Sequence, residues 1–438
     1  MWASITMDEK KESKVYGGWE VYGLKYDPFF VGPLLVFGGE ISKSTFTGRV
    51  DKIKQLKKIF MSGSSRIIVS GEPGVGKTTF VNIARSEMQD NKFFTTIREI
   101  AVQPDWDAID FILNTLFAIF NTLKRKDMGS FLTNELYKEL EGLVTLVRLE
   151  NYSGSLSILG SGAGIGKETS FNNPMITVSY LQDIFERFVS EMRKNDYRGV
   201  IIHYNNLENF ESNKLVSFFN KIRDFLLVGN VNFVFVGDLT VPPVLQSIQR
   251  VSSIFNDSAI VLNSLTFEEV KEILLKRVET LSIDGLTYVI PYEEEAVKVL
   301  YDLYNGNIRN ILNSLSTAIR EISDEVPIVL NKRLLRKILS NVAEERWLRR
   351  IPTWEKEILF CILENQEITN GEISDKLSKK RQNISKVVSK LLDMSAIFVK
   401  RVDGNQKFFE VHPSVKWFLL SEKVENKTIQ GDLLKYFS

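Results

Sequence analysis

The chain has 438 residues, of which 44% are apolar and 25% charged, and its formal net charge is +1. These shares are ordinary for a globular protein, and the length predicts two to four domains of about 100–200 residues each. The single cysteine, Cys361, excludes intrachain disulfides and a cysteine-based metal site. The longest apolar stretch, Phe111 to Leu123, is too short to span a bilayer, and the N-terminal stretch lacks the apolar core of a signal peptide, so we expect a cytoplasmic protein with no membrane partner.

The charge is unevenly distributed along the chain. Residues 331–438 hold 21 lysine and arginine residues against 14 aspartate and glutamate residues, whereas acids outnumber bases in the remainder. Such an asymmetry indicates a C-terminal module that binds a polyanion.

Residues 1–45, rich in glycine and aromatic residues, are predicted to form an irregular N-terminal segment. The next stretch, Val50 to Phe60, repeats apolar residues at helical spacing and predicts a helix. A short apolar run, Arg66 to Ser70, then reads as a buried strand that leads directly into a glycine-rich loop.

This loop, GEPGVGKTT, fits the phosphate-loop pattern G-x-x-x-x-G-K-[ST] between a strand and a helix. Its glycines let backbone N–H groups wrap phosphates, and the helix N-terminus adds the positive end of its dipole. The lysine would reach the β- and γ-phosphates of ATP, and the following threonine, Thr78, would hold Mg²⁺. The predicted nucleotide-binding residues are Gly71, Glu72, Pro73, Gly74, Val75, Gly76, Lys77, Thr78 and Thr79.

Strands and helices alternate from the phosphate loop to residue 236, which favours an α/β fold with a parallel sheet and helices on both faces. Strands are expected within 93–102, at 199–204 and at 231–236, and helices at 108–124, 134–149, 178–194 and 214–227. The glycine-rich segment 154–168 fits neither the phosphate-loop nor the dinucleotide pattern, because Ser161 and Glu168 stand where the former needs glycine and Ser or Thr. It is predicted to be a flexible hairpin or loop, or else a hairpin that projects toward DNA or a neighbouring subunit.

The pattern is helical only from Thr266 to Ile322, which predicts a small helical lid, and a helical connector follows at 330–348. Residues 354–412 then read as a winged helix: helices at 354–363, up to 377 and at 380–394, and two strands at 397–401 and 406–411. A turn at Asp403-Gly404 joins the two strands.

The third of these helices would enter the major groove of duplex DNA with its N-terminal residues first. Its exposed face and the wing carry side chains that bind phosphates and read bases. The predicted DNA-binding residues are Lys379, Lys380, Arg381, Gln382, Asn383, Lys386, Lys400, Arg401 and Lys407. The alternative is a winged helix that contacts protein and leaves this basic face solvated.

Several short segments follow in one order: Arg49, the phosphate loop, Tyr204-Asn205-Asn206, Gly237-Asp238, Arg250-Val251-Ser252-Ser253 and Gly306-Asn307-Ile308-Arg309. Over about residues 45–330 this order resembles the AAA+ ATPases, most nearly the archaeal Orc1/Cdc6-like group. The resemblance implies a P-loop AAA+ core at 46–262 and a helical lid at 263–335. The residue patterns beyond them predict a winged-helix DNA-binding domain at 345–420 and a tail at 421–438.

The resemblance also assigns roles to single residues. Asn205 and Asn206 stand where the family carries the two acids of Walker B, and an amide can neither act as a general base nor offset the charge of Mg²⁺. Glu208, two residues further on, is the candidate substitute. ATP binding with Mg²⁺ is therefore expected, whereas hydrolysis is expected to be slow.

Three further positions take their roles from the family pattern. Asp238 stands at the polar sensor-1 position, and Arg250 lies in the segment that often carries an arginine finger acting in trans on a neighbouring subunit. Arg309 matches the sensor-2 arginine, which touches the γ-phosphate and couples the lid to the nucleotide. Each also has an ordinary structural reading, as a strand-ending aspartate or a solvated arginine.

The leading functional hypothesis is a DNA-binding ATPase whose nucleotide state controls its assembly into an oligomer on DNA, as in a replication initiator or a mobile-element protein. The alternative is a STAND-like signalling or defence ATPase, in which the winged helix packs internally or contacts protein. A third reading is a structural subunit that binds ATP without turnover, given Asn205 and Asn206.

Overall fold

The computed structural model describes residues 18–39, 43–153, 176–255, 258–322, 326–365, 367–403 and 406–421. The glycine-rich segment 154–168, Gly404 of the predicted wing turn, most of the predicted C-terminal tail and residues 1–17 lie outside these ranges. The chain divides into two compact units, which we call the sheet unit and the helical unit. The sheet unit is Gly32–Glu269 with Asn307–Arg309, and the helical unit is Met1–Val31, Val270–Gly306 and Asn310–Ser438.

The sheet unit is built on a parallel sheet, as the sequence predicts. Its strand order is β2-β4-β5-β1-β6, with β3 paired to β4, and every pairing is parallel. The strands are β1 (Ser65–Gly71), β2 (Phe93–Thr95), β3 (Ile100–Ala101), β4 (Gly199–Asn205), β5 (Val231–Gly237) and β6 (Ile260–Leu262). Because the strands are parallel, the segments that follow β1, β4 and β5 emerge at one edge of the sheet.

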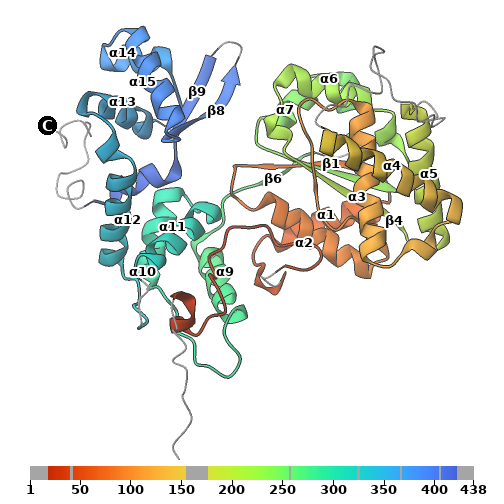
Figure 1. Cartoon of the computed structure of the whole chain (residues 1–438), viewed down its shortest axis with the longest axis horizontal. Helices are drawn as coiled ribbons and strands as arrows, with labels where there is room; N and C mark the ends of the chain where they lie inside the picture. The colour runs from red at the N-terminus through yellow and green to blue at the C-terminus, as the bar shows by residue number, and fades with distance from the viewer. Residues whose placement is uncertain are drawn as a thin grey trace, which may run out of the picture. The chain divides into compact units, whose positions relative to one another are not determined.

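Helices cover both faces of this sheet (Figure 1). They are α1 (Val50–Met61), α2 (Lys77–Asp90), α3 (Ala108–Arg125), α4 (Asn134–Ser153), α5 (Val178–Lys194), α6 (Ser212–Ile222), α7 (Val241–Gln246) and α8 (Gln249–Ser252). Strand alternation decides which side chains each face receives. Val200, Ile202 and Tyr204 of β4 enter the large apolar core formed with α3 to α8, so His203 and Asn205 point to the opposite face, toward α2.

The predicted helix over residues 214–227 is divided into two pieces. Helix α6 ends at Ile222, and a separate 3-10 turn covers Phe225–Leu227. The turn buries the adjacent side chains of Phe225 and Leu226 together, and the Phe225 ring packs edge-on against Phe111 and Phe233.

The helical unit contains the region predicted as lid, connector and winged helix. Its helices are α9 (Phe267–Thr280), α10 (Glu294–Tyr304), α11 (Ile308–Arg320) and α12 (Lys332–Arg346), where α9 and α11 begin within the sheet unit. None of the helices in the described ranges is long and apolar enough to cross a membrane. The predicted domain boundaries stay predictions.

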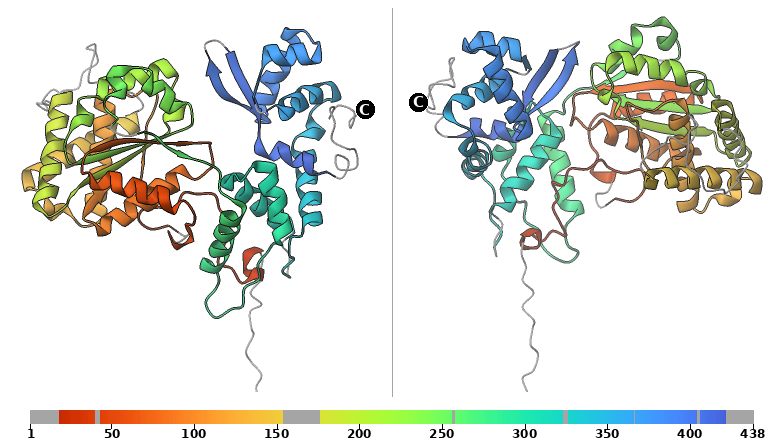
Figure 2. Two further views of the ribbon diagram at one scale, coloured as in Figure 1. Left: turned by 180° about the vertical axis from the view of Figure 1, so that it is seen from behind. Right: turned by 45° about the horizontal axis from the view of Figure 1, so that its top comes forward.

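The winged helix is formed by α13 (Thr353–Glu364), α14 (Asn370–Leu377) and α15 (Arg381–Asp393), followed by the hairpin β8 (Ile397–Asp403) and β9 (Gln406–Val411). Figures 1 and 2 show this hairpin beside the three helices. The sequence missed a short strand, β7 (Ile368–Thr369), which pairs with β9. Thr369 is also the N-cap of α14 and forms a capping box with Glu372. The sequence therefore indicates the start of a helix at this residue and gives no separate signal for the strand.

A 3-10 segment, η7 (Pro413–Leu420), closes the described part of the helical unit. Its residues return to the helices that precede the winged helix. Trp347 Nε1 donates to Ser414 Oγ at 3.0 Å, and Trp417 Nε1 donates to Ser314 Oγ at 2.8 Å. Both hydrogen bonds are buried and fix η7 against α11 and the end of α12.

Candidate functional sites

The phosphate loop has the backbone that its glycines allow. Gly74 and Gly76 take positive φ angles of 87° and 94°, and Gly76 caps α2 at its N-terminus. Lys77 is 8% exposed, and its Nζ donates to the carbonyl oxygens of Gly71 at 2.8 Å and Glu72 at 3.1 Å. The loop and the first turn of α2 therefore present backbone N–H groups and one ammonium in the arrangement that cradles phosphates.

A second segment contacts this loop within the sheet unit. Asn307 Nδ2 donates to the Pro73 carbonyl oxygen at 2.7 Å, and the Arg309 amide donates to the Gly74 carbonyl oxygen at 3.4 Å. The approach is so close that a Cβ on Gly74 would lie 2.5 Å from Asn307 Oδ1. The backbone of Arg309 therefore lies against the phosphate loop, and its role as a sensor of the nucleotide stays a prediction.

Four charged side chains influence one another around the loop: Lys77, Glu208, Asp238 and Arg309. Burial lowers the pKa of Lys77, while Glu208 and Asp238 act to raise it. Glu208 reaches solvent, yet enough protein surrounds its carboxyl that desolvation raises its pKa, against the opposing effect of Lys77 and Arg309. Asp238 is held by Thr240, whose amide and hydroxyl donate to Asp238 Oδ1 at 2.9 and 2.6 Å.

Asn205 and Asn206 occupy different positions at the end of β4. Asn205 Nδ2 donates to Thr78 Oγ1 at 2.9 Å, so its amide lies against the hydroxyl that would hold Mg²⁺. Asn206 adopts the left-handed conformation, with φ of 72°, and caps the short 3-10 turn that carries Glu208. Asparagine tolerates this backbone better than most residues, and the turn brings Glu208 into the cluster with Lys77.

Arg250 lies elsewhere. It stands on α8 with an exposed side chain, and within the described residues nothing joins it to the phosphate-loop cluster. An arginine that acts in trans needs this exposure, because its target belongs to another subunit.

A buried polar seam between α2 and β4 was not predicted from the sequence. Arg85, fully buried, donates to Asn82 Oδ1 at 3.0 Å and to Thr95 Oγ1 at 2.7 Å, and His203 Nδ1 lies 3.2 Å from both Asn82 Oδ1 and Arg85 Nη1. Burial lowers the pKa of Arg85 to about 10. Burial and the neighbouring guanidinium hold the pKa of His203 well below its usual range, so the imidazole is neutral at pH 7.

The seam continues the contact between Thr78 and Asn205 along the same faces of helix and strand. Thr78, Asn82 and Arg85 are spaced by four and three residues on α2, and His203 and Asn205 by two on β4, so each set lies on one side of its element. The available signal in the sequence was polar residues at helical spacing directly after the phosphate loop.

The winged helix separates its predicted DNA-binding residues into two groups. Lys379 pairs with Glu357, Lys400 with Glu410 at 3.3 Å and Arg401 with Glu367 at 3.1 Å. The others are exposed and form no ion pair among the described residues: Lys380, Arg381, Gln382, Asn383, Lys386 and Lys407.

The second group is concentrated at the first turn of α15. Lys380 is the N-cap residue and Arg381 the first residue of the helix, where positive charges oppose the helix dipole. Such an arrangement disfavours the free helix by about 0.3–1 kcal/mol per charge, and an anion bound there would offset this cost.

Comparisons with known proteins find similarity in the P-loop region and, at low identity, over most of the chain. The sequence model of the KAP family P-loop domain matches residues 51–253. An uncharacterised HTH-type transcriptional regulator of Methanocaldococcus jannaschii is 20% identical over 434 residues, which cover 96% of this chain and 98% of that protein.

Solved structures that match over most of the chain include the Orc1 protein of Aeropyrum pernix in complex with DNA, at 14% identity and a TM-score of 0.42, over 87% of this chain and 98% of that one. Cdc6p from Pyrobaculum aerophilum matches at 14% identity and a TM-score of 0.39, over 87% and 97% of the two chains. A Walker-type ATPase of Pyrococcus abyssi matches at 12% identity and a TM-score of 0.45, over 90% and 99%. The phosphate loop and its backbone geometry fit the KAP family P-loop domain, whose sequence model matches residues 51–253.

Proposed function

We propose that this protein binds ATP at the phosphate loop and duplex DNA through the winged helix, and that the nucleotide controls its assembly on DNA. The observation that carries the proposal is the contact of Asn307 and Arg309 with the phosphate loop. A segment that touches the loop so closely moves when phosphates occupy it. Because this segment opens α11, nucleotide binding would be transmitted to the predicted lid.

Each residue of the site has a part in this proposal. The N-terminus of α2 and Lys77 bind the phosphates, Thr78 holds Mg²⁺ and Arg309 contacts the γ-phosphate. Mg²⁺ supplies charge that neutralises the phosphate oxygens when it is bound. Arg250 of one subunit reaches the nucleotide of the next, so the protein forms an oligomer in which neighbours share sites.

Glu208 is the proposed general base for a slow hydrolysis of ATP, because the side-chain amides of Asn205 and Asn206 cannot accept a proton. A carboxylate accepts a proton only when ionised, and desolvation raises the pKa of Glu208 above its ordinary value of 4.5. Turnover should therefore fall as the pH drops through this raised pKa, at a higher pH than for an ordinary glutamate.

Glu208→Gln tests this role, with Glu211→Gln, which alters an exposed acid near the same turn, as its control. The first variant should lose turnover and its acidic pH limb while keeping ATP binding, and the second should keep both. Equal turnover of Glu208→Gln and the wild type would exclude Glu208 as the base. ATP binding with no turnover in any of these proteins would favour a structural subunit.

The DNA part is tested by binding to a short duplex, with and without ATP, at several salt concentrations. We expect ATP to strengthen binding and salt to weaken it, with a log–log slope of about −0.9 for each phosphate contact. Lys380→Glu combined with Arg381→Glu should abolish most of the binding. Absence of binding at low salt would contradict the proposal and favour a signalling ATPase whose winged helix contacts protein.

A further inference from the structure

An exposed tryptophan stands at the start of the winged helix. Trp354 lies in the first turn of α13 and is 46% exposed, whereas Trp347 and Trp417 of the same unit are buried. Each of those two buried side chains donates its indole N–H to a serine, but the Trp354 N–H has no acceptor among the residues that the structure describes. Trp354 therefore presents both an apolar ring and an unused donor to solvent.

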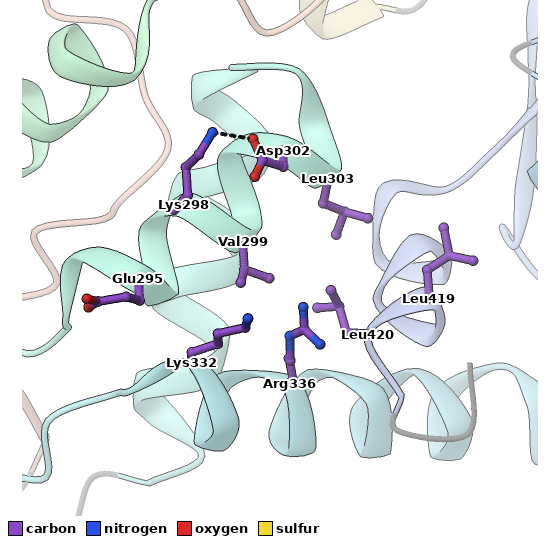
Figure 3. A pocket seen from close by; sticks show the side chains of 9 residues that line it. All are labelled: Glu295, Lys298, Val299, Asp302, Leu303, Lys332, Arg336, Leu419 and Leu420. Carbon is purple, nitrogen blue, oxygen red and sulfur yellow. Dashed lines mark hydrogen bonds and ion pairs between the residues drawn. The ribbon is translucent and has the colours of Figure 1, made fainter. Parts of the chain in front are cut away.

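This indole is not part of the pocket that the helical unit contains. That pocket lies between α10, α12 and η7, with Val299 and Leu303 among its apolar walls, and Trp354 does not line it (Figure 3). A pocket encloses a small ligand, whereas an aromatic side chain outside one meets the surface of a large partner.

The position of Trp354 is fixed by its contact with Lys379. The Nζ of Lys379 lies 6.0 Å from the centre of the indole ring and also pairs with Glu357, three residues further along α13. Residues three apart share one face of a helix, so this face of α13 borders the turn between α14 and α15. The next two residues of the chain are Lys380 and Arg381, both exposed and without an ion pair among the described residues.

The acids of α13 near this face do not cancel the charge of those two cations. Glu357 pairs with Lys379, and Glu355, which is buried, pairs with Lys390 Nζ at 2.6 Å. The carboxylates beside Trp354 are therefore neutralised within the fold, and the unpaired charge around the indole is positive.

This charge favours DNA over a protein as the partner of the indole. The centre of a protein interface is depleted of charged residues, because a cation buried there without a partner costs free energy. The phosphates of DNA would pair with Lys380 and Arg381 and bring the apolar sugars of the backbone to the same surface.

We propose that Trp354 extends the DNA contact of α15 onto α13. Its ring packs against a deoxyribose of the backbone, and its indole N–H donates to a phosphate oxygen. Both contacts are to the backbone, so Trp354 contributes affinity without a preference for any base. This inference rests on the proposed binding of duplex DNA by the winged helix.

Duplex binding by the full chain at several salt concentrations tests the contact in two variants. Trp354→Ala should weaken binding by about tenfold, because both the apolar area and the hydrogen bond are lost. Trp354→Phe, which keeps a ring without the N–H, should fall between this variant and the wild type. Neither variant removes a cation, so the salt slope of each should equal that of the wild type.

Tyr26→Ala is the matched control. Tyr26 is 49% exposed, in the same unit but outside the winged helix, and its loss should leave DNA affinity unchanged. The emission of the wild type minus that of Trp354→Phe isolates the fluorescence of Trp354, which should change when duplex is added. Thermal unfolding shows whether each variant is folded.

The outcomes separate this inference from the proposed function. A wild type that binds duplex while Trp354→Ala binds it equally well would overturn the inference alone, as would a difference emission that duplex leaves unchanged. A lower salt slope in Trp354→Ala would show that the variant disturbs the neighbouring cations, which also contradicts a direct contact. Altered self-association of Trp354→Ala with unchanged DNA affinity would assign the indole to a protein interface instead. A wild type that binds no duplex would overturn both.

Discussion

The phosphate loop and the first turn of α15 both present positive charge to an anion, but they hold it in opposite ways. Lys77 is almost fully buried and fixed by two backbone carbonyls, whereas Lys380 and Arg381 are exposed and form no ion pair among the described residues. The first arrangement suits one ligand in one geometry, since the donors are placed before it arrives. The second suits a polyanion, whose phosphates are met by long, mobile side chains and whose binding depends on salt.

The largest expected effect concerns the buried lysine of the phosphate loop. Lys77→Ala removes the buried ammonium and should weaken ATP binding by about 100-fold or more, which corresponds to about 2.8 kcal/mol. DNA binding without ATP should be unchanged, because α15 does not use this residue. Fluorescent nucleotide binding and a duplex-binding assay on the same preparation measure both. A variant that loses DNA binding without ATP would contradict the separation of the two sites.

Two double variants compare the exposed cations of α15 with the paired cations of the wing in DNA binding. Lys380→Ala with Arg381→Ala removes two exposed cations and should reduce the salt slope of DNA binding by about 1.8, at 0.9 per phosphate contact. Lys400→Ala with Arg401→Ala removes the same charge, but both residues already pair with Glu410 and Glu367, so the slope should change less. Equal changes in the two slopes would show that the paired cations of the wing contribute as much to DNA binding as the exposed cations of α15.

A smaller effect is expected at Asn205, where the phosphate-loop site has an amide instead of a carboxylate. Asn205→Asp puts a negative charge beside Thr78 and should raise the affinity for Mg²⁺-ATP by about tenfold at most, as one added charge near a metal can supply. Affinity for ATP without Mg²⁺ should fall, because the new charge repels the phosphates. Asn209→Asp, an exposed position on the next turn, is the control. Equal effects of the two substitutions would exclude a direct role for residue 205 at the metal.

The last effect falls on stability rather than on ligand binding, and concerns the buried polar seam of Arg85 and His203. Below pH 6.5 the unfolded chain binds a proton at His203 that the folded protein excludes, so the free energy of unfolding should fall as the pH drops, by up to about 1.4 kcal/mol per unit. His203→Gln should remove this slope in urea unfolding experiments. His412→Gln serves for comparison, because burial also lowers the pKa of that partly exposed imidazole. A pH slope that is unchanged in His203→Gln would show that the imidazole is protonated in the folded state.

Most elements of both regions were predictable because their signals are local. Helix α5 has the bounds Val178–Lys194 that its apolar spacing predicts, and the phosphate loop is a fixed pattern between a strand and a helix. The hairpin of the wing followed from two short apolar strands, and the face of α15 from its alternation of apolar and polar residues.

The remaining features depend on contacts between distant residues. Arg85 and His203 meet across 118 residues, and only the pairing of α2 with β4 brings them together. The ion pair between Arg401 and Glu367 needs the wing to fold back on the segment before α14, and a bulge between Val399 and Arg401 shifts the strand register. Glu208 enters the cluster through a left-handed asparagine, which no periodic pattern predicts.

The short stretch around Leu34 has a practical consequence for anyone who divides the chain into fragments. The Leu34 amide donates to Thr79 Oγ1 at 3.2 Å, and its carbonyl oxygen accepts from Asn82 Nδ2 at 3.0 Å, so this stretch is bonded to the first turns of α2. A fragment that starts at the family match, residue 51, would expose the side of α2 to which Leu34 is now bonded. Weak nucleotide binding by such a fragment would reflect this lost cover rather than a defective phosphate loop, and cloning should begin upstream of residue 32.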